Sequence, residues 1–295
     1  MATHSPSKPN KRGLFSYIFD VLRGFLIGLA ELVPGISGGT IALIVGIYEK
    51  ALHNADLIMR RKFREVDWLF LVLVGVGMVT AVFGMSTVMH IFITDYAQLA
   101  DGLFFGMVAV SIIVPLGMMD RRKANWGLAA LFVVGAVVAF FATGYTSEPV
   151  RDPSLIVIFV AAAVAVCALV LPGLSGSFLL LAMGLYEPII RAVSNREIDI
   201  ILVFIAGAAV GLILFVRVLS WLMSKHRNVT LATMAGFMLG SLRALWPWSG
   251  DAPANVGPVL GMMVLGGVIV AVFIFIDRYK QSTAQADVVA EDRPH

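Results

Sequence analysis

Two short segments of the chain share a pattern of residues that could bind an anion. Val33–Glu49 reads VPGISGGTIALIVGIYE, and Leu171–Glu187 reads LPGLSGSFLLLAMGLYE. In each segment proline ends a helix because it lacks the backbone donor, and glycine permits the tight reversal that follows. A second helix is then expected to begin at the Ser-Gly pair. Its free N–H groups and the positive end of its dipole favour an anion.

Each segment therefore predicts a hairpin tip that carries anion ligands. Hydroxyl donors would come from Ser37 and Thr40 in the first tip and from Ser175 and Ser177 in the second. Irregular backbone within a membrane is tolerated only where it is buried in protein or lines a polar cavity. The alternative is that these serines act only as helix N-caps. The candidate substrate-binding residues of the tips are Pro34, Gly35, Ser37, Gly38, Gly39, Thr40, Pro172, Gly173, Ser175, Gly176 and Ser177.

Three charged residues within apolar segments extend this candidate site. Glu31 lies three residues before Pro34, and Arg217 and Arg243 lie in long apolar runs. Charges inside a membrane are costly, so such residues are functional candidates by default. Glu31 could bind a proton or pair with an arginine, and the arginines could bind an anion. The alternatives are a structural hydrogen bond for Glu31 and snorkelling of the arginines to the membrane surface.

The composition excludes a soluble domain. The chain has 295 residues, of which 59% are hydrophobic and only 14% are charged, whereas a typical globular chain carries about 25% charged residues. The single cysteine, Cys167, excludes a disulfide framework and a cysteine-based metal site within the chain. Nucleotide-binding, metalloprotease and esterase motifs are missing from the sequence. We therefore expect no cofactor, no metal, no nucleic-acid partner and no enzymatic activity.

The apolar segments predict six transmembrane helices and two helical hairpins. A span needs about 20 residues, and the segments that reach or approach this length are 68–92, 97–118, 126–144, 199–224, 231–248 and 257–276. Two pairs of shorter segments are interrupted by Pro-Gly and predict re-entrant hairpins at 14–50 and 155–190. Residues 1–12 and 281–295 are polar and predict a disordered tail and a solvated tail.

The two halves of the chain are related by an internal duplication. Over the 17 positions quoted above, eight residues are identical at a separation of 138 (172 minus 34). A shorter connecting loop in the second copy reduces the expected separation to 132, which aligns Gly75 with Gly207. Pro, Ser, Tyr and Glu are shared as well as aliphatic residues, so chance similarity of apolar segments is disfavoured. The predicted copies are 13–145 and 155–277.

The positive charges predict that the two copies are inverted. If hairpin 14–50 enters from the cytoplasm, 17 of the 22 Lys and Arg fall in cytoplasmic segments and three fall outside. The predicted fold is an all-α polytopic membrane protein with an inverted repeat. Each copy has one re-entrant helical hairpin plus three transmembrane helices, and both termini are cytoplasmic. The two tips should then meet near the midplane, an arrangement typical of secondary transporters.

Two stretches resemble the bacterial DUF368 family of membrane proteins. They are Gly24–Lys50, GFLIGLAELVPGISGGTIALIVGIYEK, and Gly240–Trp248, GSLRALWPW, within a similarity that extends over about residues 13–280. The resemblance implies a protein that moves polyprenyl phosphate, chiefly undecaprenyl phosphate, across the cytoplasmic (inner) membrane for reuse in cell-wall polymer synthesis. It also implies that Pro34–Thr40, Pro172–Ser177 and Arg243 surround the phosphate.

The residues and the resemblance together predict a lipid-phosphate translocase. Its expected partners are a polyprenyl phosphate lipid and the bilayer, with protons as a candidate coupling ion through Glu31. The head group would lie between the tips while the lipid tail stays in the membrane. Two alternatives remain open, a secondary transporter of a small water-soluble anion and a non-transporting envelope assembly protein.

Overall fold

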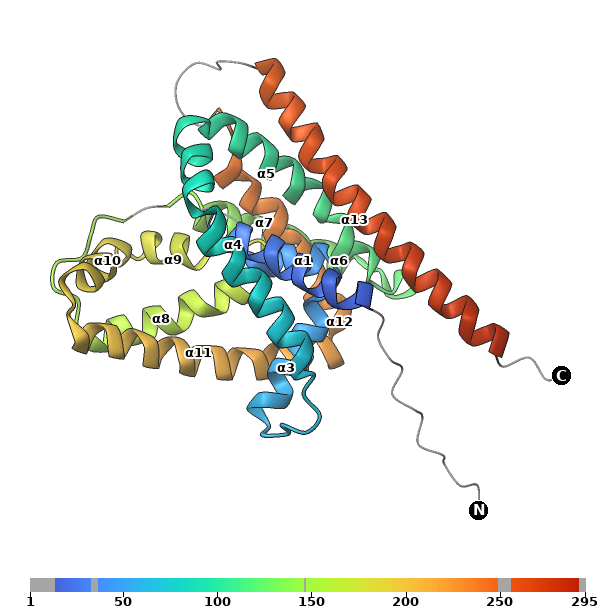
Figure 1. The fold of residues 1–295 in the computed structure, drawn as a ribbon. Helices are drawn as coiled ribbons and strands as arrows, with labels where there is room; N and C mark the ends of the chain where they lie inside the picture. Colours follow the sequence, from blue (N-terminus) through green and yellow to red (C-terminus); the bar gives the residue numbers. More distant parts are fainter. Residues whose placement is uncertain (1–13, 33–36, 146, 249–255, 292–295) are drawn as a thin grey trace.

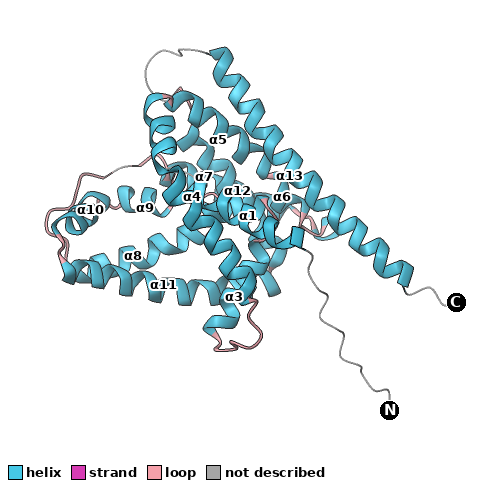
Figure 2. Ribbon diagram, viewed as in Figure 1, coloured by secondary structure: helices cyan, strands magenta, loops and turns pink. Residues whose placement is uncertain are grey.

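The computed structural model describes residues 14–32, 37–145, 147–248 and 256–291, and every regular element in these ranges is helical (Figures 1 and 2). Pro34 and Gly35 of the first predicted tip, and residues 1–12, lie outside the described residues. In chain order the elements are α1 (Leu14–Glu31), α2 (Gly38–Ile44), α3 (Tyr48–Met59), α4 (Trp68–Asp95), α5 (Ala97–Ser111), α6 (Ile113–Gly117), η1 (Arg121–Lys123), α7 (Trp126–Ala142), α8 (Leu155–Val170), α9 (Gly176–Ala182), α10 (Tyr186–Asn195), α11 (Ile198–Lys225), α12 (Arg227–Ser241), η2 (Leu242–Leu245) and α13 (Val256–Glu291).

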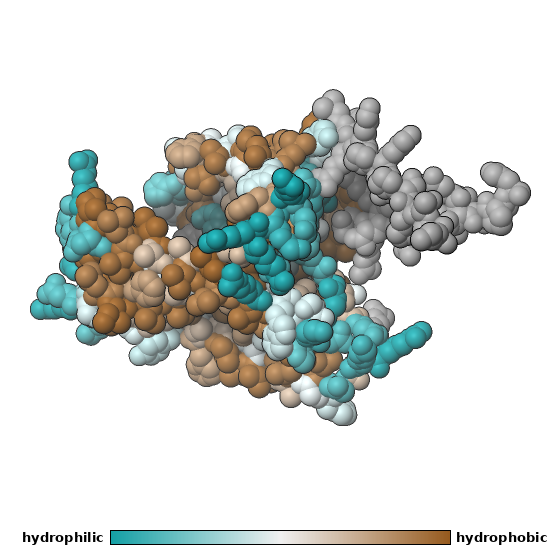
Figure 3. All heavy atoms as spheres, turned by 90° about the horizontal axis from the view of Figure 1, so that it is seen from below, coloured by the Kyte–Doolittle hydropathy of each residue, from teal (hydrophilic) through white to brown (hydrophobic). Residues whose placement is uncertain are grey.

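Four segments are long and apolar enough to cross a membrane. They are Trp68–Asp95, Ala97–Gly117, Ile198–Lys225 and Val256–Ile276. Between 11% and 39% of each is buried inside the protein, so most of their apolar surface is left for lipid. Figure 3, a view from below Figure 1, shows hydrophilic side chains gathered in a central band between broad hydrophobic areas. The predicted all-α, polytopic class is confirmed.

Two of the six predicted spans are shorter than the sequence indicates. α7 has 17 residues and ends at Ala142. The predicted span 231–248 begins earlier, at Arg227, and is broken after Ser241 by the short 3₁₀ helix η2. Pro247 follows two residues beyond η2 and cannot continue a helix. α13, by contrast, runs on as helix to Glu291, through much of the segment predicted as a tail.

Each predicted hairpin contains three helices, because its returning arm is broken once more. In the first hairpin the break lies at Gly46, and α3 then extends to Met59, well beyond the predicted end at residue 50. In the second hairpin the break lies at Gly184, where the axes of α9 and α10 differ by 111°. Both glycines have positive φ (74° and 68°), a conformation that side chains disfavour. This explains why both hairpins carry glycine at this position.

The long helices pack in four pairs through small residues. α1 packs on α4, α8 on α11, α5 on α13 and α7 on α12. In each pair one helix presents two glycines spaced four residues apart, which lets the backbones approach closely. A Cβ at these positions would come within 3.0 Å of the partner helix or overlap it: Gly24, Gly28, Gly102, Gly106, Gly207, Gly211, Gly236 and Gly240.

The helix lengths correct the alignment of the two halves. α4 and α11 both have 28 residues, α5 and α12 both have 15, and their first residues lie 130 positions apart (198 minus 68 and 227 minus 97). The predicted separation of 132 is therefore wrong by two residues. Gly77, which packs on α1, is the counterpart of Gly207, whereas a Cβ on Gly75 would meet nothing within 4 Å.

This correction predicts opposite effects for two alanine substitutions on one helix. Gly77→Ala should lower the stability by about 1–3 kcal/mol, because its Cβ would overlap backbone atoms of Val21 and Phe25. Gly75→Ala has open space and should be neutral or stabilise by up to about 1 kcal/mol through helix propensity. Thermal unfolding of both variants in detergent checks this. Equal midpoints would contradict the close packing of Gly77 on α1.

Candidate functional site

The two hairpins meet through hydrogen bonds to the end of α8. The Ser37 hydroxyl lies 2.9 Å from the carbonyl oxygen of Leu169 and 3.1 Å from that of Leu171, and it can donate to either. The Tyr48 hydroxyl donates to the carbonyl oxygen of Val170 at 3.2 Å. These carbonyls belong to the last turn of α8 and its C-cap, where no helical donor follows. The first hairpin therefore supplies partners for the broken end of the second.

A further bond joins the tips directly. The backbone N–H of Gly173 donates to the Thr40 hydroxyl at 2.9 Å, and both groups are buried. Gly173 has φ of 85° and lies so close to α12 that a Cβ would overlap the backbone of Phe237 and Met238. Only glycine fits both demands. For the described residues, the predicted approach of the two tips is confirmed.

The first turn of α2 already holds a carboxyl group of the protein itself. The N–H of Gly38 donates to Glu31 Oε1 at 3.1 Å, and the N–H of Gly39 donates to Ser37 Oγ at 3.2 Å. The N–H of Thr40 donates to the Ser37 carbonyl at 2.9 Å. Glu31 therefore fills the place that the sequence assigns to a substrate anion, and Ser37 is the N-cap of α2. Both take the roles that the sequence left as structural alternatives.

In the second tip the two serine hydroxyls are hydrogen-bonded to each other. Ser175 is the N-cap residue of α9, but its side chain makes no capping bond. Its hydroxyl instead lies 2.8 Å from that of Ser177. Gly176 packs closely on α8, where a Cβ would lie 2.6 Å from the carbonyl oxygen of Ala165, and Pro172 is buried. The serine pair can turn its donors toward an incoming group without breaking the contact between the tips.

The two predicted arginines bind the ends of other helices. Arg217 donates to the carbonyl oxygen of Met59, the last residue of α3, at 3.2 Å. Arg243 donates to the carbonyl oxygen of Phe140 at 3.1 Å, and its guanidinium lies 4.4 Å from the centre of the Phe140 ring. A positive charge at a helix C-terminus is favourable. The structure brings Glu31 and the tip residues together, but it places neither arginine in a described bond with them.

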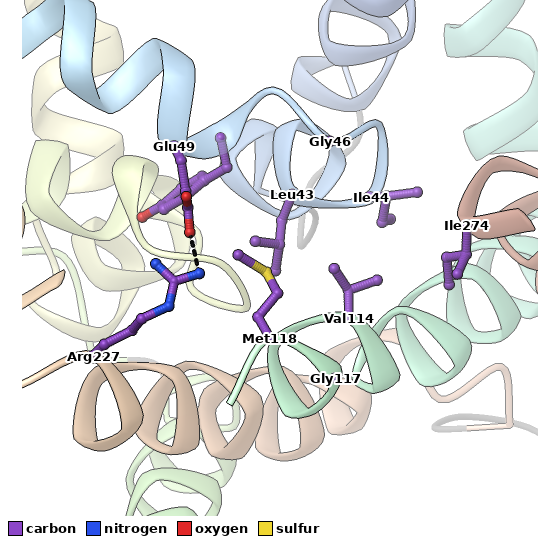
Figure 4. Close-up of a pocket in the computed structure, with 10 residues that line it drawn as sticks. Leu43, Ile44, Gly46, Glu49, Val114, Gly117, Met118, Arg227 and Ile274 are labelled. Carbon is purple, nitrogen blue, oxygen red and sulfur yellow. Dashed lines mark ion pairs between the residues drawn. The ribbon is translucent and has the colours of Figure 1, made fainter. Parts of the chain in front are cut away.

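A charged cavity lies beside the break in the first hairpin (Figure 4). It has a volume of about 330 Å³ and is lined by Leu43, Ile44, Gly46, Tyr48, Glu49, Val114, Gly117, Met118, Arg227 and Ile274. Glu49 accepts from Arg227 at 2.6 Å across it. The side chain of Tyr48 is buried, so it does not anchor the end of the hairpin at a membrane surface. The predicted helix starts at Leu231, so the sequence leaves Arg227 in a loop.

Long apolar helices and broken hairpins that meet tip to tip define a polytopic α-helical membrane protein. The chain belongs to the VCA0040-like family, which is described as undecaprenyl phosphate translocase-like and whose model matches residues 27–257. This confirms the family of polyprenyl phosphate transporters that the sequence resembles.

Two relatives of the chain are both named polyprenyl-phosphate transporter. A polyprenyl-phosphate transporter of Vibrio cholerae serotype O1 is 35% identical over 246 residues, which cover 79% of each chain. A polyprenyl-phosphate transporter of Staphylococcus aureus is 29% identical over 253 residues, 80% of this chain and 88% of the relative. No solved structure matches the chain significantly.

The bond between the tips predicts a stability loss on Thr40→Val. This change removes the acceptor for the buried Gly173 N–H and should cost about 1–3 kcal/mol, because a buried donor is left unsatisfied. Thr80→Val is the matched control: its hydroxyl is exposed and bonds only to Val76 of its own helix, so the change should stay within about 0.5 kcal/mol. Unfolding in detergent measures both. A Thr40→Val protein as stable as the control would show that the bond contributes nothing.

Proposed function

We propose that this protein carries a polyprenyl phosphate, chiefly undecaprenyl phosphate, across the cytoplasmic membrane for reuse in cell-wall polymer synthesis. The observation that carries the proposal is the direct contact between two helix-breaking tips, Ser37 with the end of α8 and Thr40 with Gly173. Such breaks lie inside a membrane protein only where protein or a polar path surrounds them. The two named polyprenyl-phosphate transporters among its relatives supply the substrate class.

The architecture we propose is an inverted repeat with both termini in the cytoplasm. Hairpins α1–α3 and α8–α10 are re-entrant, and each is followed by three helices, α4, α5 and α7 or α11, α12 and α13. The pairing of helices supports this. α1 with α4 corresponds to α8 with α11, while α5 and α7 of the first copy pack on α13 and α12 of the second. Exchange of the two copies therefore leaves the set of four pairs unchanged, as a two-fold axis requires.

The head group would cross at the tips by exchange of partners. In the present conformation Glu31 holds the first turn of α2, while the pair of Ser175 and Ser177 is bonded only within itself among the described contacts. A phosphate that enters here takes donors from the serine pair and replaces the Glu31 carboxylate at Gly38. A phosphate bound at Gly38 and an ionised Glu31 carboxylate beside it would repel each other. Glu31 must therefore swing away or take up a proton. This makes Glu31 the candidate group for proton coupling.

The remaining positive charges would meet the phosphate on its way. Arg243 lies beside the end of α7 and is exposed, and Arg217 is held by a single bond to Met59. Each guanidinium has further donors that these carbonyl contacts leave available. In this proposal the arginines guide the head group toward the tips, and the polyprenyl chain remains in the lipid beside the exposed apolar helices.

Transport of undecaprenyl phosphate in liposomes tests the function. The readout is the loss of phosphate groups that react with a reagent added outside. We expect rapid loss with the wild-type protein and at least about tenfold slower loss with Arg243→Ala, since a charge-assisted hydrogen bond to the substrate is removed. Arg191→Ala is the matched control, an exposed arginine on α10, and should transport at the wild-type rate.

Competition separates the lipid substrate from a soluble anion. A soluble phosphate monoester without a lipid tail should leave the transport rate unchanged if the chain is recognised. Inhibition by that ester, together with its own uptake, would favour a carrier of small anions. Wild-type protein no faster than empty liposomes, with and without a proton gradient, would contradict the proposed function.

The pH dependence of transport tests the role of Glu31. If this carboxylate takes up a proton as the phosphate arrives, Glu31→Gln should flatten the dependence of the rate on pH, because the neutral side chain cannot titrate. Glu65→Gln, a change to an exposed residue that pairs with Lys62, should keep the wild-type profile. A Glu31→Gln profile that parallels the wild type would exclude proton coupling through this residue.

A further inference from the structure

The charged cavity of Figure 4 has the features of a binding site for a lipid phosphate, and none of the tip residues that the structure describes lines it. It lies among α2, α3, α6, α12 and α13, and Glu49 and Arg227 are its charged residues. Arg227 is the first residue of α12, where the positive end of the helix dipole disfavours a cation. Glu49 lies in the first turn of α3, where the dipole favours an anion.

Because of this difference, an incoming anion can replace Glu49 as the partner of Arg227 more readily than an incoming cation can replace Arg227. Glu49 keeps its favourable interaction with the dipole of α3 when Arg227 leaves, whereas Arg227 keeps an unfavourable interaction with the dipole of α12 unless an anion pairs with it. Both side chains are about half exposed, so the pair itself adds little to stability. A phosphate can bind the planar guanidinium with two parallel hydrogen bonds. An incoming phosphate monoester therefore competes well with the Glu49 carboxylate for Arg227.

An apolar slot adjoins this cavity and shares Ile44 with it. The slot has a volume of about 190 Å³ between α1, α2, α4, α5 and α13. Its lining is entirely apolar: Leu26, Leu29, Ala30, Ile41, Ile44, Val45, Met89, Phe92, Leu103, Phe104, Met107, Ile269, Val270 and Phe273. An apolar cavity of about 150 Å³ accommodates benzene, so this slot has room for the first isoprene unit of a polyprenyl chain. A charged cavity next to an apolar slot matches a phosphate head joined to a hydrocarbon.

The ion pair also lies at the boundary between this cavity and another one beside α3. A second cavity of about 350 Å³ lies on its other side, and Glu49 and Arg227 line both. Polar side chains surround the outer cavity, among them His53, Asp56 and Ser220. The Ser220 hydroxyl is buried and has no hydrogen-bond partner among the described residues. Release of Glu49 from Arg227 would join the two cavities into one path.

The corresponding position in the second hairpin is covered. Ser147 donates from its hydroxyl to the carbonyl oxygen of Ala182 at 2.6 Å, and the N–H of Val150 donates to that of Gly184 at 2.9 Å. Their counterparts 138 positions earlier, Ile44 and Gly46, line the open cavity. The conformation is thus open at the break of the first hairpin and closed by residues 147–150 at the break of the second, as one state of an alternating carrier would be.

We propose that Arg227 binds the phosphate of a polyprenyl phosphate at the α3 end of the protein. The phosphate displaces Glu49 from Arg227, and the first isoprene unit enters the apolar slot beside Ile44. This rests on the proposed function and adds a head-group site apart from the tips. Arg243 lies 16 residues further along (243 minus 227), about 24 Å at the rise of an α-helix. α12 and the turn beyond it therefore carry one arginine near each side of a bilayer core.

Binding of farnesyl phosphate to the purified full-length protein in detergent tests this site. Arg227→Gln should weaken binding at least about tenfold, because a charge-assisted contact is lost. Glu49→Gln should strengthen it by up to about fivefold, because the competing carboxylate is removed. Arg122→Gln, in an exposed turn at the same end, and Glu65→Gln are matched controls and should bind as the wild type does. An excess of inorganic phosphate should not displace the farnesyl phosphate.

The outcomes separate this proposal from the general function. Wild-type protein that transports undecaprenyl phosphate, with Arg227→Gln binding farnesyl phosphate as tightly as the wild type, would overturn the site and leave the function intact. Displacement by inorganic phosphate would overturn the part assigned to the chain. If Arg227→Gln does not fold, Glu49→Gln decides, and unchanged affinity would falsify the exchange. Wild-type protein that neither binds nor transports the lipid would remove the proposed function itself.

Discussion

The structure depends on the need to satisfy the backbone groups that broken helices expose in a membrane. Lipid offers no hydrogen-bond partner, so every such group must find one within the protein. Here the first hairpin supplies partners to the second: Ser37 and Tyr48 donate to the carbonyls at the end of α8, and Thr40 accepts from Gly173. The contact between the tips is therefore a condition for having the breaks at all. The helix pairs and the cavities are arranged around it.

The long helix pairs are closely packed, whereas the charged side chains near the tips and the cavity are held by few contacts. The four long pairs pack through glycines whose replacement would force backbones apart, so they are suited to move as rigid units. The charged contacts are of a different kind. Glu31 at Gly38 and Glu49 at Arg227 are each held by one contact to a partner that a phosphate could also bind. A carrier needs this combination, because the head group must replace internal anions while the scaffold keeps its shape.

The two halves of the chain differ in their charged residues near the tips and the cavity. Glu31 and Arg227 have no charged counterpart in the other copy at the separations of 138 and 130 residues, which lead to Leu169 and Ala97. One break is open to a cavity, and the other is covered by residues 147–150.

The sequence alone determined the helical membrane class and the two helix-breaking tips, because hydrophobic length and helix-breaking residues are local properties. It also located Glu31 and Thr40. Only the tertiary structure decided what these side chains contact, that the alignment shifts by two residues, and that Arg227 faces Glu49. Those features depend on the bend at Gly46 and on contacts between helices that lie far apart in the chain. The spacing of apolar residues predicts neither the bend nor the contacts. The sequence marked the residues able to bind an anion, and the packing decided which of them already hold a partner.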